Sequence, residues 1–151
     1  MVLFGLIVVS CSSDRSASID VPFALKMPHF AGPGPTHTTN IDFFWTITVH
    51  GGAGVLVKSV RTQVREPTGG VVLETEEVST GIPPQGRPFD RPTARPPVYL
   101  PENGTVTLNQ EVRGLFPSEL YPGAWEGEAN VEVVYSSGRS EQLHASFRFQ
   151  G

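Results

Sequence analysis

Apolar and polar residues alternate along several short segments of this chain, which is the pattern of β-strands with one buried face. The clearest alternation covers residues 41–50, where Trp45 falls in the apolar set and is expected in the core. The other candidate strands are residues 19–27, 55–65, 71–78, 104–112, 126–135 and 140–149. No segment shows a convincing 3.6-residue apolar period, so the chain is predicted to be all-β with about seven strands.

The parity of each segment predicts which side chains share a face. Val21, Phe23 and Leu25 fall together in the first segment, and Leu56, Val60, Thr62 and Val64 fall together in residues 55–65. Gln110 lies on the otherwise apolar parity of residues 104–112, against the preference of its polar amide for water. The pattern therefore predicts one polar side chain on a core-facing position.

Glycine and proline punctuate the segments, with 16 Gly and 14 Pro in 151 residues. Turn residues at 51–54, 66–70 and 136–139 predict three hairpins, which favours an antiparallel two-sheet sandwich. Over about residues 19–150 the pattern resembles the immunoglobulin and fibronectin type III sandwiches of bacterial surface proteins. That resemblance implies the fold class, an immunoglobulin-like sandwich, and carries no functional residues with it.

The first residues have a different character. Residues 2–9 are an uncharged apolar run, shorter than the roughly 20 residues that a membrane-spanning helix needs and similar in length to the core of a signal peptide. The run ends in Val8-Val9-Ser10-Cys11, which resembles the bacterial lipobox. The resemblance implies a signal peptide at 1–10, a lipid-anchored tether at 11–18 and a sandwich domain at 19–151.

In that family the Cys11 thiol carries a diacylglyceryl group, and the new amine usually takes a further acyl chain such as palmitate. Two or three chains hold a protein stably on a bilayer. Ser12, in place of an aspartate, implies the outer membrane of a double-membraned cell, and the domain is expected on the extracytoplasmic side. The first charged residue is Asp14, whereas signal peptides normally open with a basic one. The alternative is an apolar first strand with a buried cysteine.

The net charge of the chain limits the classes of partner that it can bind. The formal charge is -4, which argues against nucleic acid because binding to phosphates needs a basic face. The single cysteine excludes an intramolecular disulfide. We expect a protein or glycan partner in the cell envelope, in addition to the bilayer itself.

Residues 79–101 are rich in proline, and Arg87, Arg91 and Arg95 each precede a proline. Such a segment is expected to be extended and low in conformational entropy. Three arginines against Asp90 make it locally basic, which suits a carboxylate, a phosphate or an acidic glycan. A solvated crossover loop between the two sheets explains the same residues, and we favour that interpretation.

A second loop, residues 116–125, contains Phe116, Tyr121 and Trp125. If these rings are exposed they form a stacking platform for a sugar or a protein. If they are buried they cap the open end of the sandwich, which is favoured because apolar rings prefer burial.

The remaining polar residues predict no catalytic centre. The four histidines, at positions 29, 37, 50 and 144, lack the spacing of a zinc motif. Glu74, Glu76 and Glu77 could combine with Asp42 or Glu111 as catalytic carboxylates or calcium ligands, but a solvated strand face is favoured. No Gly-x-Ser-x-Gly elbow is present.

The sequence therefore predicts a membrane-anchored, non-enzymatic binding or structural module without metal or cofactor, recognising its partner through loops or an exposed edge strand. An accessory or inhibitory domain acting on an exported enzyme is the alternative, and a hydrolase is the least favoured one.

Overall fold

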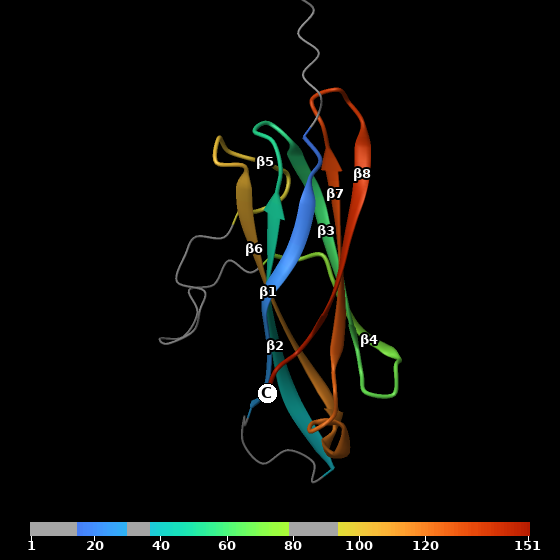
Figure 1. The fold of residues 1–151 in the computed structure, drawn as a ribbon. Coiled ribbons are helices and arrows are strands. Elements are labelled where there is room, and N and C mark those ends of the chain that lie inside the picture. Colours follow the sequence, from blue (N-terminus) through green and yellow to red (C-terminus); the bar gives the residue numbers. More distant parts are fainter. Residues whose placement is uncertain (1–14, 30–36, 79–93) are drawn as a thin grey trace, which may run out of the picture.

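The computed structural model describes residues 15–29, 37–78 and 94–151, and these form two antiparallel sheets packed face to face (Figure 1). The first sheet has the order β1-β2-β6, and the second has the order β4-β3-β7-β8 with a short β5 that also pairs with β3. The strands are β1 Ser18–His29, β2 Thr38–His50, β3 Leu56–Arg65, β4 Val71–Thr75, β5 Val98–Tyr99, β6 Thr105–Pro117, β7 Glu126–Val134 and β8 Ser140–Arg148. The predicted all-β, two-sheet immunoglobulin-like sandwich is confirmed.

Each of the seven predicted segments contains a strand, and two of the three predicted hairpins, β3–β4 and β7–β8, are present. The predicted hairpin at residues 51–54 is wrong, because β2 and β3 belong to different sheets. The two-residue strand β5 was not predicted, since it lies among prolines. A 3-10 turn, η1 (Ser118–Leu120), is the one helical element among the described residues. Within the same ranges no helix is long and apolar enough to cross a bilayer.

The position of β4 distinguishes this topology from a constant-type immunoglobulin domain, in which the fourth strand belongs to the first sheet. Here β4 pairs with the C-terminal half of β3, and β5 pairs with its N-terminal half. Among the described residues the first sheet therefore ends at β6, whose outer edge faces the margin of the second sheet beside β4.

The core lies between the sheets and is built mainly from β2 and β7. Ile41, Phe43, Trp45, Ile47 and Val49 of β2 are all fully buried, as the alternation predicts. They meet alternate residues of β7, namely Ala129, Val131 and Val133. The predicted place of Trp45 in the core is confirmed.

The predicted face of the first strand is wrong after Val21. A β-bulge between Asp20 and Phe23 inserts an extra residue and shifts the parity of the rest of β1. Ala24 and Lys26 consequently point into the sandwich, at 7% and 2% exposure, while Phe23 and Leu25 lie on the opposite face.

A second bulge, between Val57 and Ser59, has the same effect in β3. Val57 and Val60 are core residues although they have opposite parity, whereas Leu56, which was predicted to be buried, is only half-buried. The alternation of apolar and polar residues cannot locate a bulge, because nothing in the pattern marks the extra residue.

Gln110 of β6 is fully buried, in agreement with its parity. Its Oε1 accepts hydrogen bonds from Trp45 Nε1 at 2.7 Å and from the Thr62 hydroxyl, and its Nε2 donates to the Glu77 carbonyl at 3.1 Å. The amide thus joins β2, β3 and the residues after β4. This bonding satisfies a polar group that would otherwise be costly to bury.

Candidate functional site

Of the residues singled out from sequence, Cys11, Arg87 and Arg91 lie outside the described residues. Arg95 is exposed, and its Nη2 donates to the Val78 carbonyl at 3.4 Å. The neighbouring Ala94 N donates to the Thr107 carbonyl of β6 at 3.2 Å. Residues on both sides of the Arg-Pro segment are therefore joined to each other and to β6.

The platform hypothesis for the aromatic loop is wrong for Phe116 and Trp125. These side chains are 7% and 0% exposed, and their ring centroids lie 4.8 Å apart in an edge-to-face contact. Both rings also pack on Phe43, and Trp125 Nε1 donates to the Leu120 carbonyl at 3.0 Å. Burial of apolar ring area favours this cap over an exposed platform.

Tyr121 is half-buried and contacts Lys26 instead of forming a platform with the other two rings. The Lys26 ammonium lies 4.7 Å from the Tyr121 ring centroid and donates to the Gly151 carbonyl at 2.5 Å. Burial lowers the pKa of Lys26, since it disfavours the charged form. The contact holds residues that follow β8 against β1.

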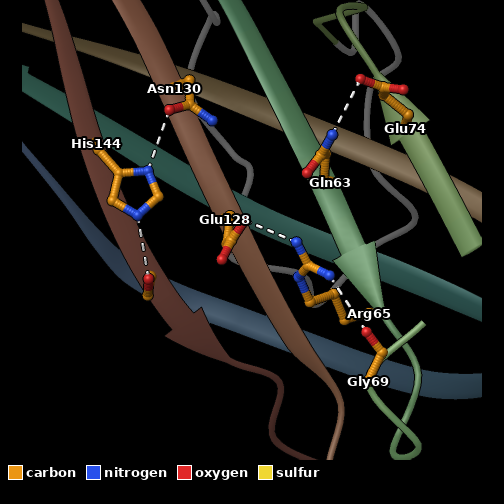
Figure 2. A network of polar contacts seen from close by, with 8 residues as sticks. Gln63, Arg65, Gly69, Glu74, Glu128, Asn130 and His144 are labelled. Carbon is orange, nitrogen blue, oxygen red and sulfur yellow. Dashed lines mark hydrogen bonds and ion pairs between the residues drawn. The ribbon is translucent and has the colours of Figure 1, made fainter. Parts of the chain in front are cut away.

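The outer face of the second sheet is polar and ion-paired (Figure 2). Cross-strand contacts connect neighbouring strands there: Arg65 with Glu128 at 3.3 Å, Gln63 with Glu74 at 3.4 Å, Lys58 with Glu132 at 2.8 Å, and His144 with Asn130 at 3.1 Å. Pairs this accessible to water contribute about 0.2–1 kcal/mol each. Together these contacts form a polar, solvated surface.

A groove of about 240 Å³ lies at one end of this face, between Arg65 of β3, Glu126 and Glu128 of β7, and Ser146 and Arg148 of β8. Its charged groups are already paired with one another, because Arg65 binds Glu128 and Arg148 binds Glu126 at 3.2 Å. A ligand here would have to displace these pairs.

A larger and more open groove, of about 770 Å³, lies at the margin where β4 and the residues after it face β6. We call it the acidic groove. Its lining is Arg61, Glu74, Thr75, Glu76, Glu77, Glu111, Val112 and Arg113, so four glutamates oppose two arginines. The structure thus brings together the glutamates of residues 74–77 and Glu111, which sequence reasoning had considered as partners.

The two arginines of the acidic groove are already engaged by carboxylates. Arg61 pairs with Glu74, and its Nε also lies 4.0 Å from Glu76 Oε1. Among the described residues, no ion pair engages the carboxylates of Glu77 and Glu111, although Glu111 acts on Arg113 at longer range and helps to raise the pKa of that arginine. Two exposed negative charges therefore face the groove, which favours a cationic group as its occupant.

Arg113 is held by Asp42, directly across the β2–β6 pair. Arg113 Nε lies 2.5 Å from Asp42 Oδ1, and Nη2 lies 3.3 Å from Oδ2. The Asp42 side chain is only 3% exposed, and His29 Nδ1 approaches it at 3.3 Å. The hydrogen bond to Asp42 raises the pKa of Arg113, so its charge is permanent and directed at the aspartate.

The edge of β6 lies along the acidic groove. The Thr107 carbonyl points away from β2, since it accepts from Ala94. By the alternation of antiparallel pairing, the main chains of Glu111 and Arg113 point the same way. No hydrogen bond among the described residues engages them on that side. An extended peptide could pair with these groups.

Sequence reasoning missed Arg61 and Arg113, and it treated Asp42 as solvated. One signal was present: Asp42 lies inside an apolar run, between Ile41 and Phe43-Phe44, where an acid needs a partner. The partner itself came from β6, some 70 residues later, and only strand pairing identifies it.

No family model matches the chain, and no curated protein matches it. Among solved structures, the Northeast Structural Genomics Consortium target SoR45 is similar at 13% identity and a TM-score of 0.53, with 89% of this chain and 87% of that chain covered. The putative ApaA protein from Bordetella pertussis is also 13% identical, with 89% and 93% covered and a TM-score of 0.48. At these identities the first similarity shows a shared fold alone.

Proposed function

We propose that the protein is a membrane-anchored, extracytoplasmic binding or structural module and not an enzyme. The lipobox resemblance at Cys11 supports the location in the cell envelope. The observation that carries the binding role is the acidic groove beside the edge of β6, where no hydrogen bond from the described residues engages the main chains of Glu111 and Arg113. Its occupant, on this proposal, is an extended segment of an envelope protein that carries arginine or lysine.

Main-chain pairing and charge would contribute to recognition in different ways. A strand added to Glu111 and Arg113 would gain main-chain hydrogen bonds without regard to sequence. Side chains from that strand that reach Glu77 and Glu111 would be selected for positive charge. An accessory or inhibitory role on an exported enzyme is one form of the same recognition.

The anchor is tested by intact-mass analysis of the protein recovered from bacterial membranes. We expect a mature chain that begins at an acylated Cys11, and loss of both lipid mass and membrane retention in Cys11→Ala. An unmodified chain that retains Met1 would contradict the anchor and leave the groove proposal standing.

The groove is tested by fluorescence anisotropy with a dye-labelled decapeptide that alternates arginine with threonine. Glu77→Lys combined with Glu111→Lys should weaken binding at least tenfold, because two attractive charges become repulsive. Glu102→Lys combined with Glu119→Lys changes the net charge equally at two exposed positions outside the groove, one in the turn before β6 and one in η1, and serves as the matched control. Equal affinity in both variants, or no binding by the wild-type protein, would contradict recognition of basic segments by this groove.

A further inference from the structure

The described chain begins at one end of the sandwich, where several turns meet. Residues 51–54 connect β2 with β3, and Gly51 N donates to Gly104 O at 2.9 Å while Gly54 N donates to Leu100 O at 3.0 Å. We call this the tether end, and it consists of residues 15–17, 51–54, 101–104 and 136–139. Figure 1 shows the start of β1 and the β7–β8 turn at this end, with the β3–β4 turn and η1 at the other.

Residues 15–17 are fixed to the tether end. Ala17 is 8% exposed, and its main-chain N donates to the Tyr135 hydroxyl at 2.9 Å. The hydroxyl in turn donates to Glu141. A Cβ built on Gly51 would lie 3.3 Å from Ala17 Cβ, which shows how closely the two segments pack. The path of the chain toward Cys11 therefore starts at this end of the sandwich.

The distance from this start to the lipid site is short. Four Cα–Cα steps separate Cys11 from Arg15, which limits their separation to about 14 Å even in a fully extended chain. By comparison, the 13 residues of β2 span about 43 Å at 3.3 Å per residue. The tether is too short for the domain to turn over and bring its other end to the membrane.

We infer that, when Cys11 carries its lipid, the tether end lies against the bilayer surface and the end with the β3–β4 turn and η1 points away from it. The inference rests on the proposed lipid anchor. On the outer face of the second sheet, the basic side chains Lys58 and Arg65 are already paired with glutamates, so this face does not attract anionic headgroups. An upright domain is therefore favoured over one lying on that face.

This orientation determines where the acidic groove lies relative to the membrane. β6 starts at the tether end with Thr105, and Glu111 lies six residues along it, or about 20 Å at 3.3 Å per residue. The groove therefore opens sideways, above the headgroups and below the outer end. A partner that is itself attached to the same membrane can reach it.

The test uses lipidated full-length protein in vesicles of phosphatidylethanolamine and phosphatidylglycerol that contain headgroup spin-labelled lipid. A fluorophore is attached through Glu102→Cys at the tether end or through Thr68→Cys in the β3–β4 turn, both exposed sites. We expect at least threefold stronger quenching at position 102. Insertion of a 20-residue Gly-Ser linker after Ser12 should reduce that difference, since the fully extended tether, at about 3.3–3.6 Å per residue, then exceeds the length of the domain.

Two results would overturn the inference, and they differ in what else they affect. Equal quenching at both positions, in protein that floats with the vesicles, would exclude the orientation while leaving the anchor intact. Protein that does not float, and whose mass shows no acylation at Cys11, would contradict the anchor and with it the orientation.

Discussion

Gln110 offers a sharp test of the interior, because replacing it by glutamate changes its charge without changing its size. The side chain is fully buried and makes three hydrogen bonds, to Trp45, Thr62 and Glu77. A protonated glutamate can reproduce all three, with its carbonyl accepting and its hydroxyl donating. An ionised glutamate cannot donate to the Glu77 carbonyl, and its charge is buried.

The size of the stability loss in Gln110→Glu follows from the difference between the pKa values of the glutamate in the folded and unfolded states. An unperturbed glutamate has a pKa of about 4.3, and burial of this kind raises the pKa in the folded state by several units. Because the folded-state pKa is the higher one, stability is complete below about pH 4 and is lost as pH rises toward the folded-state value. With about 1.4 kcal/mol per pH unit, Gln110→Glu should lose about 3–4 kcal/mol between pH 4 and pH 7 relative to the wild-type protein.

Urea unfolding at both pH values, followed by tryptophan fluorescence, measures this difference in a Cys11→Ser background. Gln110→Leu should cost roughly 2–3 kcal/mol at either pH, because the partners lose their hydrogen bonds without any titration. Gln142→Glu, on the exposed face of β8, is the matched control and should change little. A Gln110→Glu protein that is equally stable at both pH values would refute the closed, buried network.

Two further predictions concern buried ionisable groups. Burial, followed by the hydrogen bond to Glu141, raises the pKa of Tyr135 above its usual 10, so the stability it contributes is complete below pH 10 and lost as pH rises further. Absorbance at 295 nm should therefore show one of the three tyrosines ionising late, and Tyr135→Phe should remove that late step. Lys26 is 2% exposed whereas the side chain of Lys58 is 55% exposed, so an amine-reactive ester should modify Lys58 at least tenfold faster in the folded protein. Peptide mass spectrometry would show this, and equal rates would contradict the burial of Lys26.

The apolar alternation was sufficient to predict most of the strands. It placed Trp45 in the core and Gln110 beside it, because side chains on a strand alternate faces regardless of what the strand pairs with. The same reasoning failed on one side of each bulge, after the bulge in β1 and before the bulge in β3, because one extra residue reverses the parity. Lys26 is the clearest example, since the bulge turns its side chain toward the interior of the sandwich.

The acidic groove shows a second feature that the sequence pattern could not predict, namely which strands lie side by side. The sequence contained Glu74, Glu76, Glu77 and Glu111 as solvated acids, and the topology decided that β4 lies beside β3 and that β6 ends the first sheet. The same pairing set Arg113 against Asp42 and buried the aspartate.

Local periodicity and turn chemistry thus determined the fold class, the turns and most of the core from the sequence itself. Only the tertiary structure decided which edges meet, which charges pair and which aromatic rings are exposed. Those outcomes depend on contacts between residues far apart in the chain, whose energies no local pattern encodes.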